Sequence, residues 1–329
     1  MTDIKSLSER ILANLEKVIV GKRDALELIV IGLLCQGHIL IEDVPGVGKT
    51  MMARSLARSL ACTFSRIQFT PDMLPSDVTG VSIYNQQKRE FEFRAGPIIG
   101  QIILADEINR ATPKTQAALL EAMEEHQVTV DGVTHILPQP FMVLATQNPI
   151  EYEGTFPLPE AQLDRFLLRV RLGYPDLSDE IKILEEQQFK HPIETLKAIV
   201  KAKEVLEAAE TIKSVYLSPA AKRYITDLTR RTRQSGDIYL GASPRGTLSL
   251  GRACQAYAAL QGRDYVLPDD VKDLAIPVLA HRIIVSPEAR LRELGADRIV
   301  QDIIHNIPVP GGSFQASSSE ASINKKSTK

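Results

Sequence analysis

The sequence predicts an α/β fold with a parallel sheet, followed by a smaller domain built from helices. In the first half of the chain, short apolar runs of strand length alternate with helical segments. One of these runs ends in a loop rich in glycine and proline, and the loop opens directly into a helix. After about residue 175 the pattern becomes almost wholly helical. We therefore expect an α/β core over residues 1–175, a helical domain over 176–310 and a disordered tail over 311–329.

Composition favours a globular protein of the cytoplasm. The 329 residues are 44% hydrophobic and 24% charged, with a net charge of -2 and no Trp, which disfavours a surface that binds nucleic acid. Cys35, Cys62 and Cys254 lie far apart without metal-ligand spacing, so we expect buried thiols in a reducing compartment. The N-terminus does not resemble a signal peptide, and the longest apolar run, 28–35, is too short to span a membrane.

The first elements follow from apolar spacing and helix-stop signals. A helix is predicted over 4–18, with Ser6 as a possible cap, and a second over 23–36, ended by Gly37. A strand over 38–41 then leads through the glycine-rich loop to a helix over 49–60.

Later elements continue the alternation, with two interruptions. Further strands are predicted at 64–69, 102–105, 141–145 and 166–172. The helix after Ala111 has Thr112 as cap, Pro113 in its first turn, and an apolar face of Ala117, Leu120 and Met123. Two β-hairpins are predicted, one over 79–96 with a polar tip at 86–89 and one over 128–136 around Asp131-Gly132.

The glycine-rich loop predicts a phosphate site. It reads Pro45-Gly46-Val47-Gly48-Lys49-Thr50, and the helix after it presents unpaired N–H groups to anionic oxygens. Lys49 is expected to reach the β- and γ-phosphates, and Thr50 to offer its hydroxyl to Mg²⁺. Asp43 stands where the usual pattern has its first glycine. The alternative reading is a chance glycine loop that caps a helix.

Two further strands end in polar residues suited to hydrolysis. Asp106 and Glu107 follow the strand at 102–105: Asp106 is expected to hold Mg²⁺ through water, and Glu107 to orient or deprotonate the attacking water. Asn148 follows the strand at 141–145 and could bind the γ-phosphate or the water. The simpler alternatives are a solvated acidic turn and an Asx-turn before proline.

In this order, these elements resemble an AAA+ ATPase module, and most closely the MoxR family, which is related to the magnesium-chelatase ATPase subunits. The resemblance spans about residues 5–310 and is carried by Ile41 to Thr50, Ala105 to Ala111 and Phe156 to Phe166. It implies a five-stranded core, a helical lid and a homo-oligomeric ring, commonly a hexamer, with one ATP at each subunit interface. It also implies that the two hairpins are the inserts that define this clade.

The resemblance implies roles for residues outside these loops. Arg165 matches an arginine finger that reaches the neighbour's γ-phosphate, with Arg110 as a lower-ranked rival, and Arg245 matches the sensor-2 arginine of the lid, acting in cis or in trans. Val20 and Gly21 match the segment near adenine, and the nucleotide-binding loop extends to Met51. By residue chemistry alone, Arg165 reads as a surface ion pair and Arg245 as a donor to a helix terminus.

The function that these features predict is Mg²⁺-dependent ATP hydrolysis that remodels or matures a partner protein, including insertion of a metal or cofactor. In the family the partner often carries a von Willebrand A-type domain. One alternative is a nucleic-acid motor, although the second hairpin tip carries Asp131 and no Lys or Arg. Another is a nucleotide-gated scaffold without turnover. The six histidines are read as structural.

Overall fold

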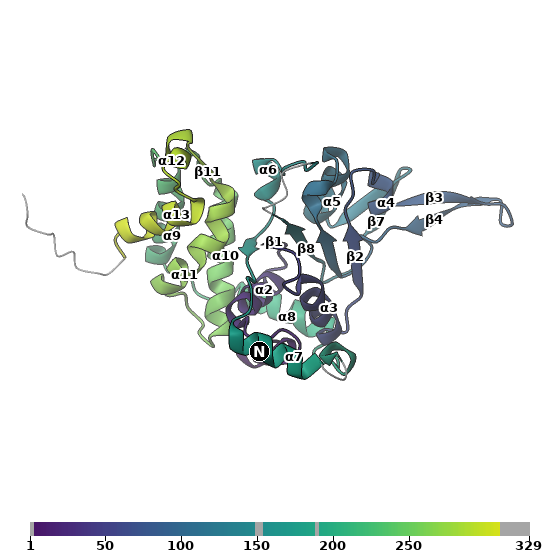
Figure 1. Cartoon of the computed structure of the whole chain (residues 1–329), viewed down its shortest axis with the longest axis horizontal. Coiled ribbons are helices and arrows are strands. Elements are labelled where there is room, and N and C mark those ends of the chain that lie inside the picture. The colour runs from purple at the N-terminus through teal and green to yellow at the C-terminus, as the bar shows by residue number, and fades with distance from the viewer. Residues whose placement is uncertain (1–2, 149–153, 188–190, 310–329) are drawn as a thin grey trace, which may run out of the picture.

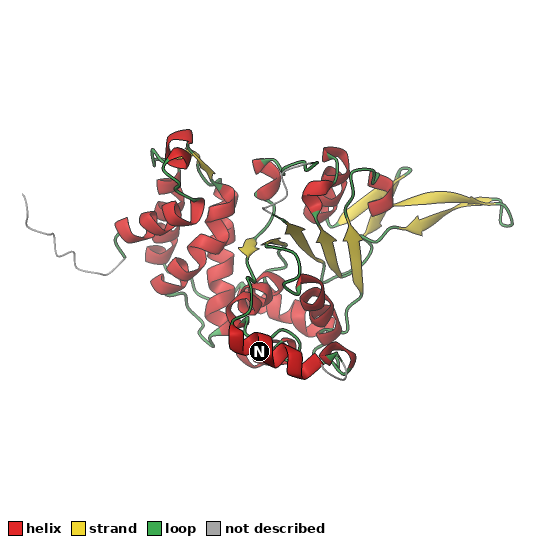
Figure 2. Ribbon diagram, in the orientation of Figure 1, coloured by secondary structure: helices red, strands yellow, loops and turns green. Residues whose placement is uncertain are grey.

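A five-stranded parallel sheet forms the centre of the computed structural model, which describes residues 3–148, 154–187 and 191–309 (Figures 1 and 2). The strand order is β2-β5-β8-β1-β9, and every pairing within the sheet is parallel. The strands are β1 (Ile39–Glu42), β2 (Phe64–Gln68), β5 (Ile102–Asp106), β8 (Met142–Gln147) and β9 (Leu168–Val170). The predicted fold class is confirmed, and all five carboxyl ends therefore share one edge of the sheet.

Helices cover both faces of the sheet, which explains why its strands are almost continuously apolar. Alternate residues of β1 point to opposite sides: Ile39 and Ile41 belong to one buried cluster and Leu40 to another. The first cluster contains α1 (Ile4–Leu15), α2 (Arg23–Leu34) and α3 (Lys49–Ser59), and the second contains α4 (Pro75–Thr79) and α5 (Pro113–Glu125).

Two local expectations were wrong. Asp3, rather than Ser6, caps α1, since Asp3 Oδ1 accepts a hydrogen bond of 3.1 Å from the backbone N–H of Ser6. Ala117 is exposed, while Leu120 and Met123 are buried as predicted. The buried face of α5 also includes Leu119, so the helix is rotated away from Ala117.

Both predicted hairpins are present. The first pairs β3 (Gly80–Asn85) with β4 (Glu90–Ala95) and projects from the core in Figure 1, and the second pairs β6 (Gln127–Val130) with β7 (Val133–Ile136). The second hairpin turns at Asp131 (φ 50°) and Gly132 (φ 79°), which is the left-handed backbone that a two-residue turn requires.

Helices dominate the chain after residue 175, as predicted. They are α7 (Leu177–Gln187), α8 (Ala202–Ile212), α9 (Pro219–Thr232), α10 (Pro244–Leu260), α11 (Pro268–Leu279), α12 (Pro287–Leu291) and α13 (Ala296–Asn306), with 3-10 turns η2 (Pro192–Glu194) and η3 (Ala280–Arg282). The short helix α6 (Glu160–Leu163) and the 3-10 turn η1 (Ile108–Arg110) lie earlier, among the elements of the α/β part. The short strands β10 (Ile238–Leu240) and β11 (Ile284–Val285) pair antiparallel. Within the described ranges, no helix has both the length and the apolar character needed to cross a membrane.

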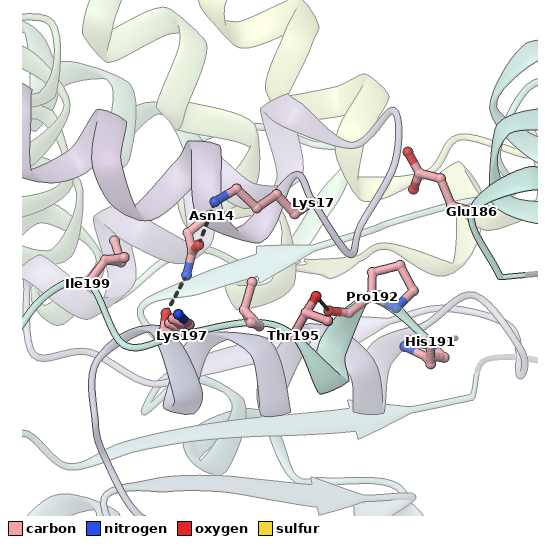
Figure 3. A pocket seen from close by; sticks show the side chains of 9 residues that line it. Asn14, Lys17, Glu186, His191, Pro192, Thr195, Lys197 and Ile199 are labelled. Carbon is pink, nitrogen blue, oxygen red and sulfur yellow. Dashed lines mark hydrogen bonds between the residues drawn. The ribbon is translucent and has the colours of Figure 1, made fainter. Parts of the chain in front are cut away.

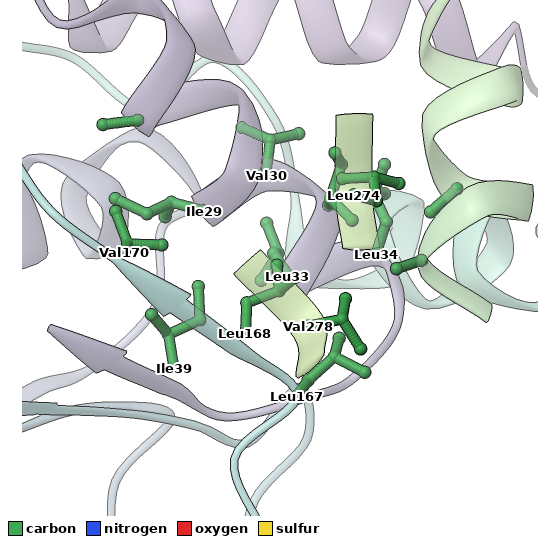
Figure 4. Close-up of a cluster of buried hydrophobic side chains, with 14 of the residues drawn as sticks. Ile29, Val30, Leu33, Leu34, Ile39, Leu167, Leu168, Val170, Leu274 and Val278 are labelled. Atoms are coloured by element: carbon green, nitrogen blue, oxygen red, sulfur yellow. The ribbon is translucent and has the colours of Figure 1, made fainter. Parts of the chain in front are cut away.

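The helical part shares its apolar core with the sheet. Figure 4 shows Leu33 and Leu34 of α2 beside Leu168 of β9, with Leu274 and Val278 of α11 next to them. Because α8 packs on α2 as well as on α10, the boundary at residue 175 stays a prediction. The expected tail, 311–329, lies outside the described residues.

Candidate nucleotide site

The loop after β1 has the backbone that a phosphate cradle requires. Gly46 and Gly48 have φ of 87° and 88°, a region that residues with a Cβ rarely adopt. A Cβ at Gly46 would meet nothing within 4 Å, so glycine is needed here for its conformation rather than for space. In the described chain no side chain caps α3, which begins at Lys49. Its first-turn N–H groups therefore suit the oxygens of a polyphosphate, and the residues from Pro45 through Val47 to Thr50 and Met51 lie in or beside this cradle.

Asp43 explains the departure from the usual pattern. Its carboxylate is buried, and Oδ2 accepts hydrogen bonds from the backbone N–H groups of Leu172 (2.6 Å) and Gly173 (2.7 Å). Oδ1 accepts another from the N–H of Val44, at 2.9 Å. Lys49 Nζ donates to the carbonyl oxygen of Asp43, at 2.9 Å. Asp43 therefore joins the start of the phosphate loop to the segment that leads from β9 into the helical domain.

The two acids at the end of β5 are fixed by one hydroxyl of the neighbouring strand β8. Thr146 Oγ1 donates to Asp106 Oδ1 at 2.6 Å and accepts from the backbone N–H of Glu107 at 2.8 Å. Glu107 has a left-handed backbone (φ 57°, ψ 50°), which is uncommon for a residue other than glycine. Its carboxylate pairs with Arg110, whose Nη1 lies 3.0 Å from Oε2.

Strand β2 supplies two further contacts that the sequence did not suggest. Arg66 Nη2 donates to Asp106 Oδ2 at 2.6 Å, and Gln68 Nε2 donates to Glu107 Oε2 at 2.9 Å. The same Arg66 nitrogen also donates to Gln68 Oε1, at 2.6 Å. Gln68 lies opposite Asp106 in the register of β2 and β5. Each acid therefore has a partner on the adjacent strand.

Sheet order brings the three predicted polar elements to one edge. Asn148 is buried and directly follows β8, which lies between β5, bearing Asp106 and Glu107, and β1, which leads to Lys49. Residues 149–153 lie outside the described chain.

The turn at Val20 and Gly21, which is predicted to lie near adenine, flanks the phosphate loop. A Cβ at Gly48 would lie 4.0 Å from Ile19 Cδ1, and the next residue along, Val20, is buried. Gly21 has φ +69°, and a Cβ there would come within 1.6 Å of Asp179 Oδ2. The start of α7 therefore lies directly over this turn.

Arg165 and Arg245 lie at the opposite edge of the sheet. Arg165 precedes β9 by three residues, and Arg245 lies in the first turn of α10. Both pair with Glu124 near the end of α5, with N···O distances of 2.9 Å and 2.6 Å. The four residues of β1 alone separate the two edges by about 13 Å. The structure therefore brings the two arginines together, but not to the phosphate loop of their own chain.

A buried junction between the core and the helical domain lies next to these arginines along the chain. Asp164 accepts from Arg282 Nε at 2.9 Å and from Ser243 Oγ at 2.7 Å, and Ser243 caps α10. Arg282 also donates to the carbonyl oxygen of Leu167, at 3.1 Å. Burial lowers the pKa of Arg282 to about 10, while Asp164 favours its charged form.

The surroundings of His38 and of the three cysteines are those of structural residues. His38 Nδ1 accepts from the N–H of Val143 at 3.0 Å, so Nε2 carries the proton and donates to the carbonyl oxygen of Met123, also at 3.0 Å. Burial lowers the pKa of His38 to about 4. The three cysteines are free, and burial raises the pKa of Cys35 to about 12 and that of Cys62 to about 11.

A hollow of about 640 Å³ lies away from this chemistry, between the end of α1 and the segment around η2 (Figure 3). Its polar groups bind one another: Asn14 Nδ2 donates to the carbonyl oxygen of Lys197 at 3.1 Å, and Lys17 Nζ donates to Asn14 Oδ1 at 3.2 Å. Among the residues the structure describes, no group of three or more His, Cys, Asp or Glu side chains could hold a metal ion. The carboxyl edge of the sheet is therefore the better candidate site.

Comparisons with known proteins agree with this geometry. The model of the ATPase family associated with various cellular activities (AAA) matches residues 38–168, and the AAA lid domain model matches 230–303. The uncharacterised protein YeaC of Bacillus subtilis is 53% identical, over 94% of this chain and 96% of its own. Chaperone MoxR1 of Mycobacterium tuberculosis is 39% identical, over 92% and 82%. A crystal structure from Cytophaga hutchinsonii is 40% identical, with a TM-score of 0.86 over 93% of this chain and 96% of that one.

Proposed function

The chain belongs to the MoxR family of AAA+ ATPases, and we propose that it binds ATP with Mg²⁺ and hydrolyses it at a site completed by a second copy of the chain. The observation that carries the proposal is the meeting of a glycine-rich phosphate loop with Asp106 and Glu107, both held by Thr146, at one edge of the sheet. This is where open α/β sheets bind their ligands.

Each side chain at this edge has a defined task in the proposal. Lys49 binds the β- and γ-phosphates, and Thr50 and Asp106 would hold Mg²⁺, which would neutralise phosphate charge. Glu107 accepts the proton of the water that attacks the γ-phosphorus, while the bond to the β-phosphate oxygen breaks and ADP leaves. Asn148 orients that water or binds the γ-phosphate.

Arg165 and Arg245 complete the site of a neighbouring copy. Their place at the amino edge supports action in trans for both, because the phosphate loop of the same chain lies at the carboxyl edge. A guanidinium supplied by the neighbour stabilises charge in the transition state, so turnover depends on assembly. We propose a ring, with a hexamer as the family's common form.

ATP turnover would remodel or mature a client protein in the cytoplasm, including one that receives a metal or cofactor. The relative from Mycobacterium tuberculosis is named as a chaperone, which supports this role. The projecting β3–β4 hairpin exposes Ile83, Tyr84 and Phe91 and offers an apolar surface for such a client. A protein with a von Willebrand A-type domain is the first client to test.

A nucleic-acid motor is less well supported. At the first hairpin Lys88 is paired with Glu92, and the second hairpin turns at Asp131. DNA binding that weakens steeply with salt, or hydrolysis stimulated by DNA, would favour the motor instead.

Two substitutions separate binding from hydrolysis. Glu107→Gln is expected to bind ATP and hardly hydrolyse it, whereas Lys49→Ala is expected to lose binding, both measured with a fluorescent ATP analogue and a phosphate-release assay. Glu121→Gln, an exposed change on α5, serves as control. Near-normal turnover of Glu107→Gln would refute its catalytic assignment, and absence of turnover by the unaltered chain would favour the scaffold.

Mixing tests action in trans. Arg165→Ala is expected to bind ATP without turnover, and mixing it with Glu107→Gln should restore part of the activity, because some interfaces then combine an intact Arg165 with an intact Glu107. If mixed assemblies form and remain inactive, Arg165 does not act on a neighbour.

A further inference from the structure

One carboxylate binds both of the arginines that are proposed to serve a neighbour. Glu124 Oε2 lies 2.9 Å from Arg165 Nη2, and Glu124 Oε1 lies 2.6 Å from Arg245 Nη2. Both carboxylate oxygens are therefore engaged, one with each guanidinium. Arg165 follows α6 and Arg245 begins α10, so the bridge also joins the α/β core to the helical domain.

The bridge borders a hollow of about 190 Å³ at the amino edge of the sheet. Arg165, Arg245 and Arg252 line this hollow together with two carboxylates, Glu124 and Asp164. Asp164 already binds Arg282 and Ser243, one at each oxygen. Among the acids that line the hollow, Glu124 is therefore the one that balances Arg165 and Arg245.

Two guanidinium groups that share one anion form an arrangement suited to phosphate. A phosphate carries more charge and more acceptor oxygens than a carboxylate, so it can replace Glu124 as the shared partner. The three side chains are 29% to 45% exposed, so an anion from outside can reach them. Each ion pair this exposed contributes at most about 1 kcal/mol, so an incoming phosphate can break both, at a cost that remains measurable.

We propose that Glu124 takes the place of the neighbour's γ-phosphate in the separate protomer and is displaced when two copies join around ATP. Glu124 thus keeps Arg165 and Arg245 side by side before assembly, and it opposes assembly by competing for them. It is a positioning residue, since it acts through the two arginines. The inference rests on the proposed function, in which these arginines act in trans.

ATP-driven assembly of the full chain tests the competition. Sedimentation velocity at increasing ATP concentrations gives the ATP concentration at which half of the protein has assembled. All variants also carry Glu107→Gln, so that bound ATP is retained. Glu124→Gln removes the negative charge with little change of shape, and this concentration is expected to fall about tenfold, since two partly exposed ion pairs need not be broken. Glu125→Gln, an exposed neighbour outside the bridge, is expected to leave it unchanged.

Glu124→Asp keeps the charge on a shorter side chain, so a smaller fall in the ATP concentration at half-assembly is expected. This variant is used in place of Glu124→Gln if circular dichroism shows that Glu124→Gln misfolds. The role of Glu124 is overturned if its variant needs as much ATP for half-assembly as Glu125→Gln does, or more. Failure of the Glu107→Gln parent to assemble with ATP overturns the proposed function instead, and this inference with it. The two failures are thus distinct.

Discussion

Replacing Asp43 by glycine, which would restore the usual loop pattern, is expected to destabilise the protein. The buried carboxylate accepts hydrogen bonds from the N–H groups of Leu172 and Gly173, at 2.6 and 2.7 Å. A hydrogen bond to a charged group contributes about 1.5–3 kcal/mol, so losing both lowers the free energy of unfolding by about 3–6 kcal/mol. Asp43→Asn keeps an acceptor without the charge and should cost about half as much.

Urea unfolding followed by far-ultraviolet circular dichroism measures this loss, since the chain has no Trp for fluorescence. Asp302→Ala is a matched control, because the Asp302 side chain is half exposed and pairs with Arg298 one helical turn away at 3.3 Å. ATP affinity of Asp43→Gly should fall as well, since the start of the phosphate loop loses its attachment. An unfolding free energy within about 1 kcal/mol of the original would refute the reasoning.

Three further outcomes are expected. The pKa of His38 is lowered from 6.5 to about 4, so the unfolded chain binds a proton before the folded chain does as pH falls. The unfolding free energy should therefore drop by about 3 kcal/mol between pH 6.5 and 4. His38→Gln should remove that part of the acid sensitivity when urea unfolding is measured over a range of pH. Arg66→Gln should lower the Mg²⁺ concentration needed for binding of a fluorescent ATP analogue, because the Arg66 guanidinium otherwise competes with Mg²⁺ for the Asp106 carboxylate. An unchanged dependence on Mg²⁺ concentration would contradict this. Gly21→Ala should lower the unfolding free energy by about 1–2 kcal/mol through its left-handed backbone, while the Asp179 carboxylate turns aside to make room, so a thermal melt like that of the original chain would count against this conformation.

Contiguous motifs made much of the carboxyl edge predictable. Gly48, Lys49 and Thr50 encode a loop and a helix start within a few residues, and Asp106-Glu107 closes an apolar strand. Because parallel strands end at a common edge, predicting their type was enough to place these groups together. The hairpins were predictable for a similar reason, since turn chemistry such as Asp131-Gly132 is local.

The missed residues meet their partners through register and packing rather than local spacing. Gln68 reaches Glu107 because β2 and β5 pair in a register that places it opposite Asp106, and Thr146 contacts both acids from the neighbouring strand β8. Glu124 contacts arginines of distant segments, and nothing in its own helix signals this. Ala117 was misplaced for a related reason, because tertiary packing set the rotation of α5.

The opposite placement of the phosphate loop and the Arg165–Arg245 pair restricts how copies can join. A two-fold dimer brings the same surface of each copy together, whereas the contact that action in trans would require joins unlike surfaces head to tail. When this head-to-tail contact is repeated, an open row of copies has one completed site fewer than it has copies. A closed ring has as many completed sites as copies. The last copy to enter would therefore create two completed sites at once, whereas each earlier addition creates one, so the gain in total ATP turnover is expected to double at the closing step.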